Sequence, residues 1–185
     1  MKKIYCQIGM IGVMLAFAAP AFSESNVACP VETPYEDAGG NPVTFQDKFG
    51  YDVLEKMQCN KRRSNVRMVM QVNQYKQGDN PYGFRNLGNI VKDFEMTHGI
   101  ENWKIAVVVH SGGGNLVLNN KDDNPLLDKV MPWVSHPNVD VYFCLNTAAA
   151  KGWKTDQIID GVKFVPAGLS AIMDFQYQGY KYVQP

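Results

Sequence analysis

The sequence lacks a net charge and any long run of one charge. Basic and acidic residues number 18 each, and charged residues make up 19% of the 185 positions. The basic patch of a dedicated nucleic-acid-binding protein is therefore missing. Low-complexity tracts are also missing, whereas 45% of the residues are hydrophobic and 11% aromatic. These features exclude a disordered, fibrous or coiled-coil protein and predict one globular domain with a sizeable core.

Long apolar runs are missing as well. The most apolar stretch covers residues 8–19 and is too short for a permanent transmembrane helix, which needs roughly 20 apolar residues. It follows a basic start at Lys2 and Lys3 and precedes small residues at Ala21 and Ser23. This pattern is typical of a secretory signal peptide over residues 1–23, so we expect a periplasmic or secreted mature protein. The alternative is a retained N-terminal anchor.

Cysteine is scarce, with four residues in the chain. Cys6 lies in the expected signal peptide, so three remain, and an odd number in an exported protein means that at least one is free, modified or bonded to another molecule. Cys29 and Cys59 flank a segment rich in proline and glycine that a disulfide would hold together. A bridge between them would close a loop of about 30 residues, worth roughly 3–4 kcal/mol in the chain-entropy model. We expect this bridge, the alternative being two unpaired structural cysteines.

Residues 24–64 are expected to form a loop-rich N-terminal extension, and residues 65–185 an α/β domain. From Val66 onward, short β-rich runs alternate with helix-like segments, which indicates a parallel sheet. The five expected strands cover residues 66–72, 105–109, 139–143, 162–165 and 180–183. The pattern predicts a three-layer sandwich of flavodoxin-like or Rossmann-like layout with a mostly parallel five-stranded sheet.

The expected helices are placed by their start and stop signals. The first has Asn80 as N-cap and Pro81 at its first position and ends at Gly99. After a possible helical turn at residues 115–118, the next helix starts at Asn124-Pro125, and Pro132 should break or kink it. Three shorter elements complete the list: a helix over residues 148–151 capped by Asn146-Thr147 and stopped by Gly152, a second starting at Thr155, and a last one over residues 168–178.

Two loops follow strand ends, where open α/β sheets bind ligands. They are residues 110–114, His-Ser-Gly-Gly-Gly, and residues 144–147, Cys-Leu-Asn-Thr. If their strands are neighbours, a thiol, an imidazole and free backbone amides converge on one edge. A thiol just before a helix start favours the thiolate, so Cys144 is the expected nucleophile. The alternative is a cysteine buried as a small apolar residue.

The other candidate residues each have a structural alternative. His110 can pair with the thiolate or a bound anion, or it can be a hydrogen-bonded structural residue. Asn146 and Thr147 can offer backbone amides to a substrate, or serve only as helix caps. Gly112, Gly113 and Gly114 can also hold an anionic group, but they lack the order of a phosphate-binding loop, and the alternative is that they only let backbones approach closely.

Metal and cofactor motifs are not evident. The three histidines, His98, His110 and His136, are twelve and twenty-six positions apart, without the short paired spacing of zinc ligands. No Cys-x-x-Cys motif for haem attachment or thioredoxin-type chemistry occurs. We therefore expect no metal and no cofactor.

Four segments carry a resemblance to a known family: VVVHSG (107–112), VYFCLNT (141–147), GVKFVPAG (161–168) and QGYKY (178–182). In order and spacing they resemble the DsrE/DsrF-like family, especially its exported single-domain members. The resemblance implies a flavodoxin-like fold, trimers or hexamers, and a role in sulfur relay. In the relay proteins, a cysteine after the third strand, followed by alanines and a glycine, accepts sulfane sulfur as a persulfide. Cys144, followed by alanines at 148–150 and by Gly152, resembles that site.

The leading hypothesis is a periplasmic sulfurtransferase or sulfur carrier that holds sulfane sulfur on Cys144, with His110 positioning the donor or supplying a proton. Its expected partners are a sulfur donor or acceptor, either a protein or a small thiol, and further copies of itself. No nucleic-acid partner and, after signal cleavage, no membrane partner is expected. One alternative is a non-catalytic oligomeric module that binds a small ligand or a protein. Another is a small redox protein in which Cys144 forms a mixed disulfide.

Overall fold

The computed structural model describes residues 32–36, 39–44, 47, 65–96 and 102–185. The expected signal peptide and the expected disulfide partners Cys29 and Cys59 lie outside these residues, as does the expected helix stop at Gly99. Within the described part of the chain, no helix has the length and apolar character needed to cross a membrane.

A five-stranded sheet forms the centre of the domain. Its strands are β3 (Arg67–Val72), β6 (Lys104–Val109), β7 (Val139–Cys144), β8 (Lys163–Val165) and β9 (Lys181–Val183). They lie in the order β8-β7-β6-β3-β9, and every pairing is parallel. Runs of β-branched residues such as Ile105–Val109 favour strands covered on both faces. The predicted α/β fold with five strands is confirmed.

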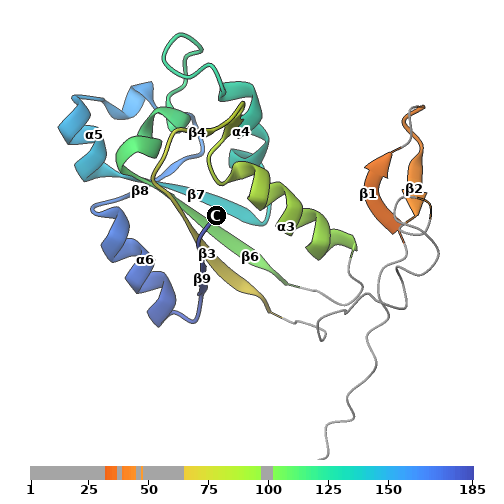
Figure 1. Ribbon diagram of the computed structural model, residues 1–185. Helices are drawn as coiled ribbons and strands as arrows, with labels where there is room; N and C mark the ends of the chain where they lie inside the picture. Colours follow the sequence, from red (N-terminus) through yellow and green to blue (C-terminus); the bar gives the residue numbers. More distant parts are fainter. Residues whose placement is uncertain (1–31, 37–38, 45–46, 48–64, 97–101) are drawn as a thin grey trace, which may run out of the picture.

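Helices cover both faces of this sheet. Along the chain they are α3 (Phe84–Met96), the 3-10 helix η1 (Ser111–Val117), α4 (Leu127–Val134), α5 (Leu145–Lys151), the short 3-10 helix η2 (Thr155–Gln157) and α6 (Gly168–Tyr177). Figure 1 shows α3, α4 and α5 on one side of the sheet and α6 on the other. Successive strands are added in one direction across the sheet, from β3 through β6 and β7 to β8, and the chain then crosses back to β9 at the other edge. Because crossovers between parallel strands are right-handed, this reversal puts α6 on the opposite face. The result is the three-layer, flavodoxin-like arrangement.

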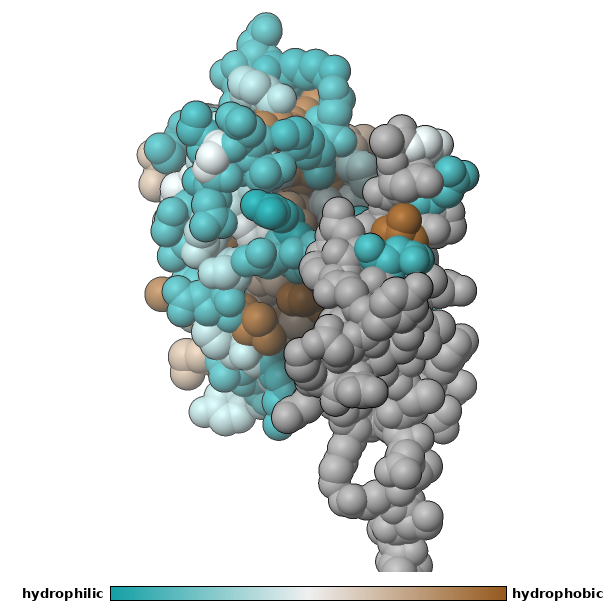
Figure 2. All heavy atoms as spheres, turned by 45° about the vertical axis from the view of Figure 1, so that its right-hand side comes forward, coloured by the Kyte–Doolittle hydropathy of each residue, from teal (hydrophilic) through white to brown (hydrophobic). Residues whose placement is uncertain are grey.

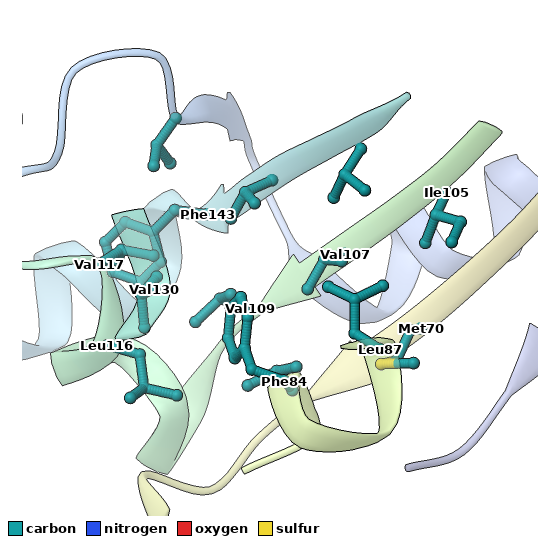
Figure 3. Close-up of a cluster of buried hydrophobic side chains, with 14 of the residues drawn as sticks. Met70, Phe84, Leu87, Ile105, Val107, Val109, Leu116, Val117, Val130 and Phe143 are labelled. Atoms are coloured by element: carbon teal, nitrogen blue, oxygen red, sulfur yellow. The ribbon is translucent and has the colours of Figure 1, made fainter. Parts of the chain in front are cut away.

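The core divides between the two faces because successive strand residues point to opposite sides. The larger cluster lies beneath α3, η1 and α4, and Figure 3 shows Phe84 and Leu87 of α3 among its strand side chains. On the opposite face, Val69, Ala106 and Val108 pack with Ile172 of α6. Among the described helices, α6 is the one that covers that face.

Two helix boundaries differ from the predictions. Asn80 and Pro81 do not start a helix, because they form β5, which pairs with β4 (Lys76–Gln77) in a two-stranded ribbon, and α3 begins at Phe84. Pro132, predicted to break or kink the next helix, does not break it, since α4 continues through it to Val134. Proline lacks an N–H and its ring crowds the carbonyl four residues earlier, but core packing of an amphipathic helix, here through Val130, can outweigh that local cost.

Two boundaries near the candidate loops also shift. η1 starts at Ser111, so the three glycines are part of a helical segment and not of a free loop. The N-cap of α5 is Cys144 itself, which places Asn146 and Thr147 inside the first turn; the prediction that they cap the helix from outside is wrong. Gly152 does end α5, in the left-handed conformation with φ of +69°.

Part of the expected loop-rich extension forms a hairpin. β1 (Glu32–Glu36) pairs antiparallel with β2 (Pro42–Thr44), with a register shift between Glu32 and Glu36. Figure 2 shows one face of the molecule, on which hydrophilic side chains predominate among the described residues. By contrast, α6 carries exposed apolar side chains at Leu169, Met173 and Tyr177.

Candidate functional site

The two candidate loops lie side by side at the carboxyl edge of the sheet. β6 and β7 are neighbours, with Val109 paired to Phe143, so His110 and Cys144 follow at the same edge. β8 lies on the other side of β7, and Cys144 pairs with Val165. Three consecutive strands therefore deliver their following residues to one place, as neighbouring strands were expected to do.

A pocket of about 360 Å³ opens at this edge. It is lined by His110, Ser111, Cys144, Asn146, Thr147, Ala150, Lys151, Ala167, Gly168 and Leu169. Cys144 is 5% exposed and lines this pocket. Its surroundings include hydroxyl and amide donors and are not purely hydrocarbon.

Hydrogen bonds stabilise the thiolate form of Cys144. Burial raises the pKa of the thiol, but this is outweighed by hydrogen bonds from the Thr147 hydroxyl and from the backbone amides of Thr147 and Gly168, with a smaller effect of Asn146. The pKa of Cys144 therefore lies below its ordinary value of 9.0. The Asn146 amide also donates to the Pro166 carbonyl at 3.2 Å. The lowered pKa raises the share of Cys144 that is thiolate, the form of cysteine that acts as a nucleophile.

Thr147 connects the two loops. The backbone amide of Ser111 donates to Oγ1 of Thr147 at 2.9 Å. Because that oxygen accepts from Ser111, its own hydrogen is free to donate to the sulfur of Cys144. Thr147 is buried, so the arrangement is held by packing as well as by hydrogen bonds.

His110 is buried, and both of its ring nitrogens have partners. Nδ1 lies 2.8 Å from Oγ of Ser111, and Nε2 lies 2.8 Å from the side-chain nitrogen of Gln71. Burial lowers the pKa of His110 below its ordinary value of 6.5, so the ring is neutral at pH 7. The ring contacts of His110 are thus with Gln71 and Ser111, as in the alternative of a hydrogen-bonded structural residue, and His110 also lines the pocket.

The three glycines serve close packing. A Cβ at Gly113 would lie 2.5 Å from the Val72 carbonyl oxygen, and one at Gly112 would lie 2.9 Å from that of Asn73. At Gly114 a Cβ would meet the Trp153 ring at 2.8 Å. None of the three is among the residues that line the pocket, and these contacts fit the alternative that the glycines let backbones approach closely.

Several residues at the site were not predicted from the sequence. Gln71 lies near the carboxyl end of β3, where it is the one polar residue among Met68–Val72, and that polarity was an available signal. Gly168 packs against the His110 ring, its Cβ position lying 3.0 Å from Cβ of His110, and Lys151 places a cation on the pocket wall. No group of three or more histidine, cysteine, aspartate or glutamate side chains suited to a metal ion occurs among the residues that the structure describes.

The chain is similar to known proteins over most of its α/β domain. Residues 69–185 match the model of the DsrE/DsrF-like family. No curated protein matches the chain. Among solved structures, a protein of unknown function, MTH1491 from Methanobacterium thermoautotrophicum, is 23% identical with a TM-score of 0.49, covering 65% of this chain and 99% of its own. The YchN protein from E. coli is 18% identical with a TM-score of 0.41, over 65% of this chain and 99% of its own.

Proposed function

The chain belongs to the DsrE/DsrF-like family, and from this premise we propose that it binds or transfers sulfane sulfur as a persulfide on Cys144. The observation that carries the proposal is the sulfur of Cys144 at the end of β7, lining a pocket and surrounded by donors that lower its pKa. A thiolate, not a thiol, is the species that attacks sulfur.

The proposed reaction is a thiol exchange at sulfur. The Cys144 thiolate attacks the outer sulfur of a donor R–S–SH, a new S–S bond forms to Cys144, and the S–S bond of the donor breaks. The products are the Cys144 persulfide and the thiolate R–S⁻, so no external oxidant or reductant is needed. In the second half, an acceptor thiolate attacks the outer sulfur of the persulfide, and the Cys144 thiolate leaves.

The pocket fits a small anionic donor or the sulfur-bearing tip of a partner protein. Its volume of about 360 Å³ is at the lower end of the range for small-molecule sites. Lys151 contributes a positive charge, and Ser111 contributes a hydroxyl group. We propose that the protein acts in the periplasm after removal of residues 1–23, where the donor or acceptor is an exported protein or a small thiol.

Self-association through α6 is part of the proposal. Leu169, Met173 and Tyr177 are 63%, 55% and 85% exposed and recur every four residues, so they form one apolar stripe along the helix, here called the α6 stripe. An exposed apolar stripe of this kind marks an interaction surface. Leu169 also lines the Cys144 pocket, so a second copy on the α6 stripe would lie beside the pocket entrance.

Loading and unloading of sulfur test the function. We expect the protein incubated with polysulfide or thiosulfate to gain about 32 Da, the mass of one sulfur atom, on the peptide that contains Cys144. We expect a reduced small thiol to remove this mass again, since transfer returns the Cys144 thiolate. Intact-mass and peptide mass spectrometry measure both steps. A Cys144 peptide of unchanged mass after incubation would contradict the proposal.

The second candidate function is a non-catalytic binding module of the same fold. The low exposure of Cys144 favours it, because a thiol that only packs needs no access to solvent. The two functions differ in one measurable property, the reactivity of Cys144 in the folded protein.

A further inference from the structure

A row of hydrogen-bonded side chains crosses the sheet behind the pocket. Tyr182 of β9 donates its hydroxyl hydrogen to the side-chain oxygen of Gln71 at 2.6 Å. The side-chain nitrogen of Gln71, on β3, lies 2.8 Å from Nε2 of His110, at the end of β6. The strand order β6-β3-β9 puts these three residues next to one another although 111 positions separate Gln71 from Tyr182.

The direction of these hydrogen bonds determines the tautomer of His110. An amide nitrogen can only donate, so Nε2 of His110 accepts. A neutral imidazole carries one hydrogen, which must then lie on Nδ1, and burial keeps the ring neutral by lowering the pKa of His110. Nδ1 donates to Oγ of Ser111 at 2.8 Å, and the hydroxyl hydrogen of Ser111 is left for a group in the pocket that Ser111 lines.

We propose that Gln71 is a positioning residue: it holds His110 in the tautomer with hydrogen on Nδ1, so that Ser111 presents its hydroxyl hydrogen to the sulfur donor bound beside Cys144. The identity of the bound group rests on the proposed function, whereas the tautomer is a property of the protein alone. A donated hydrogen in this place stabilises the negative charge on an anionic donor or on its leaving group.

The backbone of Ser111 supports this role. Its φ is +50°, a left-handed conformation that serine rarely adopts, and such conformations occur where surrounding contacts hold a functional residue in place. Here the contacts are the amide of Ser111 on Oγ1 of Thr147 and the ring of His110 on its hydroxyl. The backbone amide and the hydroxyl group of Ser111 are thereby both held in place.

The charged and titratable groups around His110 come from three elements. Cys144 and Lys151 line the same pocket from β7 and α5, and Tyr182 reaches Gln71 from β9. α6 contributes Gly168 and Leu169, which carry no charge. The tautomer of His110 is therefore measured at a pH above the pKa of Cys144, so that most of Cys144 is thiolate in every sample.

The tautomer is measured directly from the ¹⁵N chemical shifts of the His110 ring, without any sulfur compound present. At about pH 9, where histidine is neutral, we expect hydrogen on Nδ1 in the natural protein. In Gln71→Glu we expect hydrogen on Nε2, because a carboxylate only accepts, and a pKa of His110 above that of the natural protein. Hydrogen on Nε2 in the natural protein, or an unchanged tautomer in Gln71→Glu, would overturn the proposal.

Sulfur uptake provides the second readout. At the same pH we expect Gln71→Glu to take up sulfur about tenfold more slowly, the cost of one lost hydrogen bond to a charged group. Tyr182→Phe, at an edge strand, frees the amide to rotate, so both tautomers and an intermediate rate are expected. This variant keeps the test valid if Gln71→Glu does not fold. If the tautomer reverses and the rate of sulfur uptake is unchanged, the role of Ser111 is refuted. If the natural protein takes up no sulfur, the proposed function is refuted, and the ¹⁵N spectrum alone then decides the tautomer of His110.

Discussion

Replacing Cys144 by serine is expected to abolish sulfur loading completely. Serine keeps the size of the side chain and accepts the hydrogen bonds of Thr147 and Gly168, but its hydroxyl group does not ionise near neutral pH and cannot hold a sulfane sulfur. After incubation with polysulfide, the mass gain of about 32 Da expected for the natural protein should be missing in Cys144→Ser.

The matched control leaves Cys144 as the only cysteine of the mature chain. In the double variant Cys29→Ser, Cys59→Ser, one sulfur atom per chain should still be gained. Melting curves of both variants establish that the α/β domain is folded. Loading of Cys144→Ser at the natural level would show that another thiol carries the sulfur.

Placing a charge on the α6 stripe is expected to convert an oligomer into monomers. Met173 is 55% exposed in the single chain, and its burial between copies would contribute about 2 kcal/mol for each contact. In Met173→Asp that contribution is lost, and a carboxylate without a partner would have to be buried at a cost of several kcal/mol. The fold should be retained, because Met173 points away from the side of α6 that packs Ile172 on the sheet.

Light scattering coupled to size-exclusion chromatography measures the mass in solution. The natural protein should elute as a trimer or hexamer and Met173→Asp as a monomer. Asp174→Lys changes the charge on the same helix outside the α6 stripe and should keep the natural mass. A monomeric natural protein, or an unchanged oligomer in Met173→Asp, would refute association through this face.

The strands were predictable from the sequence because buried parallel strands are continuous apolar runs. Ile105–Val109 is of this kind, and Val139–Phe143 is apolar except at Asp140; both ranges fall within one residue of β6 and β7. The start of α3 was predicted wrongly because Asn80-Pro81 is a good helix start and equally compatible with a short edge ribbon. Pairing with Lys76–Gln77 across the two-residue turn Gly78-Asp79 decides for the ribbon.

Site residues that directly follow a strand end were predictable from the sequence. Site residues that meet only because their strands are neighbours in the sheet were not. Cys144, His110 and Thr147 lie in the loops that the sequence identified. Gln71 and Tyr182 join them only because β3 lies between β6 and β9, an arrangement that strand propensities do not determine. The glycines were assigned to ligand binding because their tight contacts with Val72 and Asn73 are visible only in three dimensions.

The most direct test is the rate at which a small alkylating reagent modifies Cys144 in the folded protein as a function of pH. We predict complete modification through the pocket, with the rate rising through a midpoint below pH 9.0, because the thiolate reacts and the pKa of Cys144 is lowered. In Thr147→Val, which loses the hydroxyl donor, the rate at neutral pH should fall roughly tenfold and the midpoint should rise. A folded protein in which Cys144 resists the reagent at every pH would contradict the account.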